Sequence, residues 1–136
     1  STDKTGECKG PINMDKNYVI NRFASVEEQE KDETSILSYV KQSVKLRNIF
    51  PEIARGTIEI LSDVEDGDIF AVSKTYNDSK IIILANTDKE ETKTVTLSRE
   101  KNNYTCIQGM LTVGEDKPYQ VEDTIVLPPY SIVILK

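Results

Sequence analysis

Four carboxylate side chains surround a single glycine in the segment 63–68 of this sequence. Calcium ions bind about six to eight oxygen ligands, so a calcium loop is the chemistry that such a segment suggests. A helix–loop–helix calcium loop that starts at Asp63 needs a glycine at position 68 and a glutamate at position 74, where the sequence has Asp68 and Lys74. We therefore interpret the segment as a solvated turn and expect no metal site in it.

Paired carboxylates also cleave glycosidic bonds, one as the general acid and the other as the nucleophile or base. The acidic residues of this sequence cluster in turns, and no pattern brings two of them into one apolar pocket. The sequence has no histidine, so it lacks the commonest general base for a serine or cysteine nucleophile and the commonest transition-metal ligand. We expect no catalytic residue, no substrate-binding residue, no metal ligand and no cofactor in this chain.

Tyrosines and cysteines leave two questions open. Sugar-binding surfaces use exposed aromatic rings, and Tyr76, Tyr104 and Tyr119 flank predicted turns. Tyrosines at strand ends more often pack at the rim of a sandwich, so sugar contact through these rings is the alternative interpretation. Cys8 and Cys106 are the two cysteines. A disulfide between them is open, and we favour two free thiols.

Length and composition fit one compact domain and little more. The chain has 136 residues, of which 38% are hydrophobic and 29% are charged, a balance that supports one core with a solvated surface. The net charge of −6 repels phosphates, so we expect no nucleic-acid partner. No apolar run has the length of a membrane span. Ser1 is not an initiator residue, and the sequence reads as a fragment.

The elements that position these residues begin with an arm and a helix. Residues 1–31 are polar and predict an irregular N-terminal arm. A helix is predicted over 32–50, with Asp32 or Thr34 as its N-cap and Pro51 as its stop. Its apolar stripe consists of Ile36, Leu37, Tyr39, Val40, Val44, Leu46 and Phe50. A stripe of this width needs a partner, for which we favour a second domain; an isolated domain that exposes the stripe can also dimerise through it.

From Thr57 onward, hydrophobic residues alternate with polar ones, and turn residues separate short segments rich in Val, Ile, Thr and Tyr. The predicted strands are 57–61, 69–76, 80–86, 92–98, 104–108, 110–113, 124–127 and 131–135. The continuous apolar run 81–85 predicts a central strand that is covered on both faces. The fold class is therefore mainly β: an antiparallel Greek-key β-sandwich of about eight strands preceded by one amphipathic helix and an irregular N-terminal arm.

Three stretches resemble the C-terminal end of the α-amylase family of glycoside hydrolases. The stretch 35–56 contains Leu46-Arg47, Pro51 and Arg55-Gly56, and it is similar to the last barrel helix of that family and its "LR…P…RG" exit. The stretch 69–87 is similar to the first long hairpin of the family's C-terminal domain. The closing stretch 127–135 looks like its "LPPYSxxVL" strand. The arm resembles the insert that precedes the last helix in starch-degrading bacterial members.

This resemblance implies two parts: residues 1–56 as the arm and last helix of a truncated (β/α)8 barrel, and residues 57–136 as the C-terminal β-sandwich domain. The catalytic carboxylates of the family lie on earlier barrel strands, so the implied role is a non-catalytic fragment. It would stabilise an upstream barrel that acts on starch or related α-glucans. The resemblance also implies an extracellular or cell-surface location in a bacterium.

Two alternatives of other classes remain. The sandwich can be a stand-alone carbohydrate-binding module that contacts an α-glucan. It can also be a domain of a non-catalytic relative of the amylase fold, as in the heavy subunits of amino-acid transporters.

Overall fold

The computed structural model describes residues 24–136, and the chain divides into two compact units, 1–40 and 41–136. In the first unit, helix α1 (Val26–Glu30) lies within the segment that we predicted to be an irregular arm. The Ser25 hydroxyl accepts a hydrogen bond from the Glu28 amide, and the Glu28 carboxylate accepts one from the Ser25 amide. This reciprocal cap stabilises a helix that is short and rich in charged residues. The rest of the predicted arm, residues 1–23, lies outside the described residues.

Helix α2 (Ile36–Ile49) confirms the predicted helix but not its N-cap. The hydroxyl of Ser35, rather than Asp32 or Thr34, accepts the hydrogen bond from the amide of Ser38, at 3.2 Å. Asp32 instead closes a turn through the Thr34 amide. Because Asp32 bonds within its own turn, the cap position falls to Ser35.

As predicted, α2 ends just before Pro51, and Pro51 also starts a new helix. Helix α3 (Pro51–Arg55) follows directly after Phe50, which has non-helical backbone angles of φ −112° and ψ 88°. Proline suits the first position of a helix because the N–H of that residue has no carbonyl partner within the helix. Its absence there therefore loses no hydrogen bond. The exit from α2 is therefore a bend between two helices.

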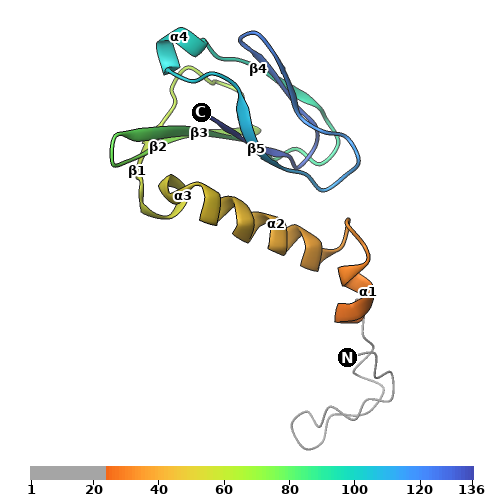
Figure 1. Cartoon of the computed structure of the whole chain (residues 1–136). Helices are drawn as coiled ribbons and strands as arrows, with labels where there is room; N and C mark the ends of the chain where they lie inside the picture. The colour runs from red at the N-terminus through yellow and green to blue at the C-terminus, as the bar shows by residue number, and fades with distance from the viewer. Residues whose placement is uncertain (1–23) are drawn as a thin grey trace, which may run out of the picture. The chain divides into compact units, whose positions relative to one another are not determined.

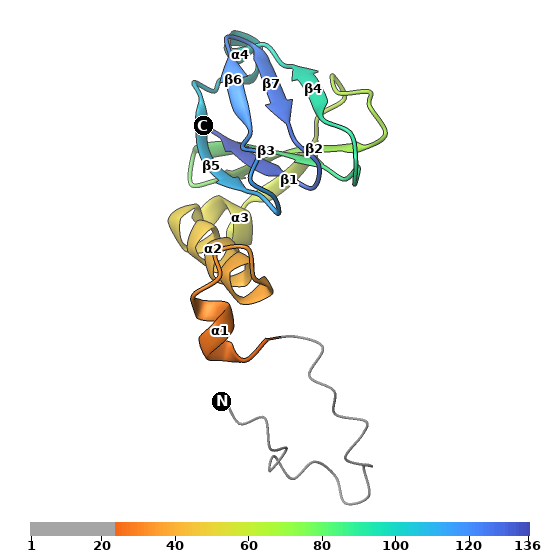
Figure 2. The ribbon, with the colours of Figure 1, turned by 90° about the vertical axis from the view of Figure 1, so that its right-hand side faces the viewer.

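The second unit is a two-layer antiparallel sandwich, as predicted (Figures 1 and 2). Its strands are β1 (Thr57–Ile60), β2 (Ile69–Tyr76), β3 (Ser79–Asn86), β4 (Lys93–Thr96), β5 (Ile107–Leu111), β6 (Tyr119–Val121), β7 (Thr124–Leu127) and β8 (Ile132–Leu135). One sheet has the order β1-β2-β3-β8-β5 and the other β4-β7-β6. The insertion of β8 between β3 and β5 is a non-sequential order of the Greek-key kind.

The main core lies between the sheets and is built mainly from alternate residues of β2, β3, β7 and β8, with Val95 of β4. The five-stranded sheet contributes Ile69, Ala71, Ile82, Leu84, Val133 and Leu135, and the three-stranded sheet contributes Val95, Leu97, Ile125 and Leu127. In β3, Ile82 and Leu84 face this core, while Ile81 faces the opposite layer and is also fully buried. The prediction of a central strand covered on both faces is therefore correct at Ile81, Ile82 and Leu84, whereas Ile83 and Ala85 are half-buried.

A second, smaller core covers the outer face of the five-stranded sheet. Phe50 packs there with Ile81 and Ile134, and the half-buried side chains of Leu46, Ile53 and Ile83 complete the cluster. Gly109 of β5 makes this approach possible, since a methyl group at that position would lie 2.9 Å from Leu46 Cδ2 and 3.0 Å from Phe50 Cε2. We expected Phe50 to dock on another domain, but it is 6% exposed and belongs to this domain's own core.

The apolar stripe predicted for the helix thus divides into two faces. Leu46 lies on the face that covers the sheet, whereas Val44 is 49% exposed in the second unit. In the first unit, the beginning of α2 likewise leaves Ile36 and Val40 exposed. In the second unit, therefore, the end of the helix has one face packed on the sheet and another face exposed.

Two strand predictions differ from the structure. The segments 104–108 and 110–113 are a single strand, β5, whose register with β8 shifts between Ile107 and Gly109. The extra residue of this bulge interrupts the alternation, which made one strand look like two. Strand β6 and the short helix α4 (Arg99–Asn102) were not predicted. The tight turn at Asn77-Asp78 was predicted, and both residues have the positive φ angles of a type I′ hairpin.

Gly56, the last residue of the resemblance to the "RG" exit, is required for steric reasons. Its φ of −71° is ordinary, but an added Cβ would lie 2.6 Å from the carbonyl oxygen of Glu52 and 3.1 Å from both Lys74 Cβ and the Thr75 amide nitrogen. We expect Gly56→Ala to lower the free energy of unfolding by about 1–3 kcal/mol. Gly67→Ala is the control because its Cβ would meet no atom within 4 Å. Urea unfolding of both variants measures the difference, and equal stabilities would contradict this packing.

Candidate functional site

The acidic segment 63–68 is organised by lysines. The Lys93 ammonium lies 3.0 Å from Asp68 Oδ2 and 3.2 Å from Glu91 Oε2, and Lys101 lies 2.6 Å from Asp63 Oδ2. The hydrogen bonds to Asp68 and Glu91 raise the pKa of Lys93 well above its usual range. Among residues 24–136, no group of three or more His, Cys, Asp or Glu side chains is arranged to hold a metal ion. Asp63, Asp66 and Asp68 instead pair with ammonium groups.

One carboxylate is buried, and it joins three distant parts of the second unit. Glu52 of α3 is 1% exposed, and its Oε1 accepts hydrogen bonds from Ser79 Oγ at 2.6 Å and Lys136 Nζ at 2.7 Å. Burial raises the pKa of Glu52, but the bonds from Lys136 and Ser79 outweigh this effect and hold the pKa below its ordinary value. Glu52 Oε2 has no hydrogen-bond partner among the described residues. A lone ionised carboxylate beside a lysine lacks the second acid of a glycosidase pair, so Glu52 fits a structural role.

Asn86 connects two of the stretches that carry the family resemblance. It ends β3, it is 2% exposed, and its Nδ2 donates to the carbonyls of Glu91, Leu127 and Pro128 at 2.8, 3.0 and 3.1 Å. Its Oδ1 accepts from the Asp88 amide at 2.9 Å. The turn after Leu127 is therefore fixed to the end of the β2–β3 hairpin, which aligns β8 beside β3.

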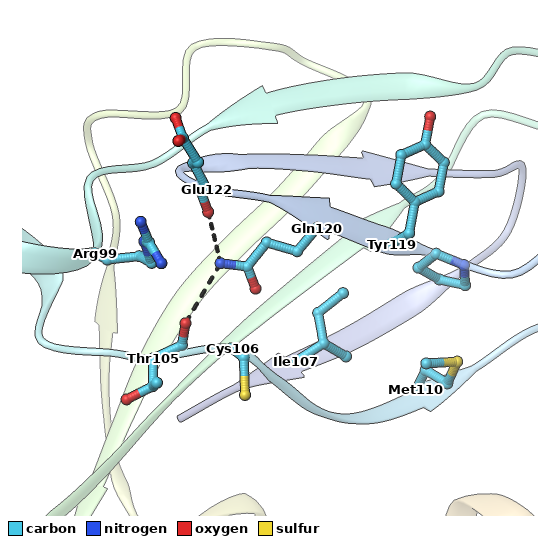
Figure 3. A pocket seen from close by; sticks show the side chains of 9 residues that line it. Arg99, Thr105, Cys106, Ile107, Met110, Tyr119, Gln120 and Glu122 are labelled. Atoms are coloured by element: carbon cyan, nitrogen blue, oxygen red, sulfur yellow. Dashed lines mark hydrogen bonds between the residues drawn. The ribbon is translucent and has the colours of Figure 1, made fainter.

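A groove of about 390 Å³ opens along one edge of the sandwich (Figure 3). Strands β5 and β6 are the last strands of their sheets on that edge. Met110 pairs with buried Val133, and Gln120 pairs with buried Ile125, so both occupy inward-facing positions on strands that have no further neighbour. The groove is the open seam between the sheets. Its lining is Arg99, Thr105, Cys106, Ile107, Met110, Pro118, Tyr119, Gln120 and Glu122.

The groove is apolar toward one end and polar toward the other. Figure 3 shows the Tyr119 ring and Met110 near one end, with Arg99, Thr105 and Glu122 near the other. Gln120 lies between them, and its Nε2 donates to the carbonyl of Glu122 at 2.7 Å and to that of Thr105 at 3.5 Å. Its Oε1 is buried and has no partner among the described residues. Because this oxygen is enclosed, the amide helps to fix the ends of β6 and is not open to the groove.

The three tyrosines singled out from the sequence have different surroundings. Tyr104 is buried and donates its hydroxyl to the Leu97 carbonyl at 2.6 Å. Tyr76 is half-buried, with the Arg55 guanidinium 5.9 Å from its ring centre. Tyr119 is 56% exposed. Tyr130, which was not singled out, is also exposed, at 48%; Tyr119 and Tyr130 are the exposed tyrosines among residues 24–136.

Cys106 is exposed and forms no disulfide with another residue of the described part of the chain. Cys8 lies outside the described residues, so whether the two cysteines pair stays open. No helix in residues 24–136 has the length and apolar character needed to cross a membrane.

Comparison with known proteins gives relatives that are much longer than this chain. No protein-family model matches the sequence. The protein named "Probable oligo-1,6-glucosidase 3" of Bacillus subtilis (strain 168) is 27% identical over 126 residues, which cover 92% of this chain and 21% of that protein. The chain thus spans about a fifth of the length of this curated relative.

Solved structures match the same share of larger chains. Amy13B of Eubacterium rectale superposes with a TM-score of 0.84 at 29% identity, over 95% of this chain and 24% of that one. The isomaltulose synthase PalI of Klebsiella sp. LX3 superposes with a TM-score of 0.63 at 22% identity, over 91% of this chain and 21% of its own; it supports the fold alone. By sequence and by fold, the chain is similar to one part of α-amylase-family glycoside hydrolases, and that part is consistent with the family's C-terminal region.

Proposed function

We propose that this chain is a non-catalytic C-terminal domain of an α-amylase-like glycoside hydrolase and that it stabilises the catalytic (β/α)8 barrel of that enzyme. The comparisons support this proposal because the matched part is about a fifth to a quarter of each relative. The parent enzyme would act on starch or related α-glucans, at an extracellular or cell-surface site in a bacterium. The substrate and location come from the family resemblance.

The observation that carries the proposal is an uncovered apolar surface on the outer face of the five-stranded sheet. We call Ile58, Ile60 and Phe70 the outer patch; they are 57%, 84% and 50% exposed. The register places Ile60 opposite Val72, and Phe70 is two residues before Val72 on the same face of β2. The outer patch therefore lies on the face that Phe50 covers only in part.

The rows of the sheet show where this cover stops. Ile60, Val72, Ile83, Ile134 and Gly109 form one row across the five strands, and Phe50 and Leu46 lie over its far end. The next row begins with Phe70 and Ala85, which are exposed and half-buried. A contiguous apolar face of this kind favours a protein partner. In the proposed enzyme that partner is the barrel to which α2 would belong.

The test compares one substitution in two settings. In the isolated 136-residue chain, Ile60→Lys is expected to leave the melting temperature unchanged because the side chain is already 84% exposed. In the parent enzyme, the same change should lower the melting temperature by several degrees. It removes an isoleucine whose burial against the barrel contributes about 1.5–3 kcal/mol, and it places the lysine charge in the interface. Val113→Lys, also at an exposed residue, is the control in both settings.

An unchanged melting temperature of the Ile60→Lys enzyme would overturn the packing proposal. An activity assay tests the non-catalytic role directly. The isolated chain should release no reducing sugar from starch or from isomaltooligosaccharides. Measurable turnover would contradict the non-catalytic role.

A further inference from the structure

The outer face of the three-stranded sheet has no role in the proposed packing on a barrel. Phe50 and Leu46 lie over the outer face of the five-stranded sheet, and the three-stranded sheet lies on the other side of the main core (Figure 2). The two outer faces therefore point in opposite directions. A partner that covers the outer patch would leave the three-stranded sheet open.

The register of β4, β7 and β6 fixes which side chains form this open face. Ile125 of β7 is fully buried in the main core, so Thr124 and Val126 on either side of it point outward. Residues directly opposite each other on paired strands share a face of the sheet. The set that we call the threonine–tyrosine face therefore consists of two rows: Thr94, Val126 and Tyr119, and Thr96, Thr124 and Val121.

The exposure of the side chains agrees with this assignment. Tyr119 is 56% exposed and Val121 is 61% exposed, while Gln120 between them is turned toward the core. Figure 3 shows the Tyr119 ring and the Gln120 side chain leaving β6 in different directions. The Tyr119 ring therefore belongs to the outer face of the sheet.

The polar groups of this face are hydroxyls that are open to a ligand. Thr94 and Thr96 are exposed, and Thr124 is half-buried. Their hydroxyl groups have no hydrogen-bond partner among residues 24–136. They are also carried by β-branched side chains with a restricted χ1 angle, so they lose little conformational freedom on binding.

Size and charge favour a small neutral ligand over a protein. Strands in a sheet are about 4.8 Å apart and alternate residues of a strand about 7 Å apart, so the two rows present on the order of 200 Å². A stable protein interface needs about 800 Å² on each partner. All the side chains of the threonine–tyrosine face are uncharged, although 29% of the residues in the chain are charged. The face therefore offers no ion pair to a charged ligand.

We propose that the threonine–tyrosine face binds an α-glucan oligosaccharide; the choice of glucan rests on the proposed function. A sugar ring presents an apolar face of C–H groups and a rim of hydroxyls that both donate and accept hydrogen bonds. The Tyr119 ring and the neighbouring Val121 provide an exposed apolar surface for the first of these. The threonine hydroxyls, each a donor and an acceptor, match the second.

The rows also determine how such a ligand lies. From Tyr119 to Thr94 a row crosses three strands, a distance of about 10 Å. A sugar stacked on Tyr119 places the next units over β7 and β4, within reach of Thr124, Thr94 and Thr96. This length suits a di- or trisaccharide better than a single glucose.

The experiment is a titration of the isotopically labelled 136-residue chain with maltotriose and isomaltotriose, followed by amide chemical shifts. We expect saturable shifts for at least one of these sugars at residues of β4, β6 and β7, with a dissociation constant on the order of millimolar. Trigalacturonate is the control for charge, because it is α-linked but carries carboxylates. It should bind more weakly, since the face has no cation and the net charge of −6 repels it.

Variants locate the contact. Tyr119→Ala should weaken binding by about tenfold because the stacked ring is lost, and Tyr119→Phe should retain most of the affinity because the ring remains. Thr94→Val keeps the shape of the side chain but removes the hydroxyl, and should weaken binding by about three- to tenfold. Tyr130→Ala and Thr57→Val change an exposed tyrosine and an exposed threonine outside this face and should leave the affinity unchanged.

The inference would be overturned by an absence of shifts for both α-linked glucans, by shifts confined to other strands, or by shifts that Tyr119→Ala does not reduce. Tighter binding of cellotriose would assign the face to β-linked glucans instead. Shifts at this face that depend on protein concentration without sugar would make it an interface between two copies of the chain. The titration of the unsubstituted chain decides the matter even if a variant fails to fold.

The Ile60→Lys melting experiment reports separately on packing against a barrel, because Ile60 lies on the five-stranded sheet. Loss of the sugar site and failure of the proposed function therefore give different results.

Discussion

Replacing Asn86 with alanine is expected to lower the free energy of unfolding by about 3 kcal/mol. The amide of this 2% exposed side chain donates to three carbonyls, those of Glu91, Leu127 and Pro128. Each carbonyl that stays buried without a donor contributes a desolvation penalty. The loss also frees the turn between β7 and β8 from the end of β3. Equilibrium denaturation in urea measures the change.

Asn86→Asp separates the loss of the amide from the loss of side-chain volume. It keeps the shape of the side chain but places a carboxylate opposite carbonyl oxygens, so at neutral pH it should destabilise the fold at least as much as alanine. Part of the loss should return at acidic pH, where the carboxyl group is protonated and can donate. Gln108→Ala, at an exposed residue whose amide contacts only the Cys106 sulfur, should change the stability by less than about 0.5 kcal/mol. An Asn86→Ala variant as stable as this control would contradict the role given to the amide.

Replacing Lys136 with methionine is expected to lower the free energy of unfolding by about 2–3 kcal/mol at neutral pH. The change leaves the Glu52 carboxylate buried with a single hydrogen bond, from Ser79 Oγ, and without a counter-charge. Because the lysine side chain itself is 43% exposed, water can enter from that side, so we expect a loss below that of a fully enclosed pair.

The pH dependence of this loss follows from the shift of the Glu52 pKa. In the native chain the folded-state pKa lies below the ordinary value of 4.5. The contribution of Glu52 is therefore fully present above that value and disappears as the pH falls through the folded-state pKa. Without Lys136, burial dominates and raises the folded-state pKa above its ordinary value, so the variant loses stability as the pH rises through 4.5 toward its own pKa. The difference between the two proteins should be largest at neutral pH and shrink in acid.

A double variant provides the control for the charge. Glu52→Gln in the Lys136→Met background removes the unpaired charge and should recover part of the stability and abolish the pH dependence that Glu52 causes. Chemical denaturation of the unsubstituted chain and the two variants between about pH 4 and pH 7 tests this expectation. A stability difference that does not vary with pH would mean that the carboxylate is not ionised in the folded protein.

The alternation of apolar and polar residues was enough to predict the sandwich, and most strands agree with it to within one or two residues. The prediction failed where the pattern is too short or interrupted. Strand β6 has only three residues and follows Pro118, so its sequence carries almost no periodicity. In β5, the bulge before Gly109 breaks the alternation.

The hydrogen bonds between residues that are distant in the chain could not be predicted from the sequence alone. Asn86 and the turn at Pro128 both lie in stretches that resemble the amylase family, yet they are 42 residues apart in the chain, and only the fold shows that they bond. Packing of Tyr104 at the rim was the favoured interpretation, and the ring is indeed buried, but the sequence could not show that it follows the left-handed Asn103 that ends α4. The groove was missed for the same reason: the edge strands that form it are adjacent only once both sheets exist.

The cover of the five-stranded sheet has a consequence for how the chain folds during synthesis. Leu46 and Phe50 leave the ribosome early, but Gly109, against which they pack, follows roughly sixty residues later, a delay of about 3–12 s at ordinary elongation rates. During that interval the apolar helical segment lacks the part of its cover that β5 and β8 provide, although Ile81 of β3, which packs with Phe50, is already synthesised. High contact order of this kind slows folding, so a nascent chain stalled before β5 should be a target for chaperones, and one released after β8 should not.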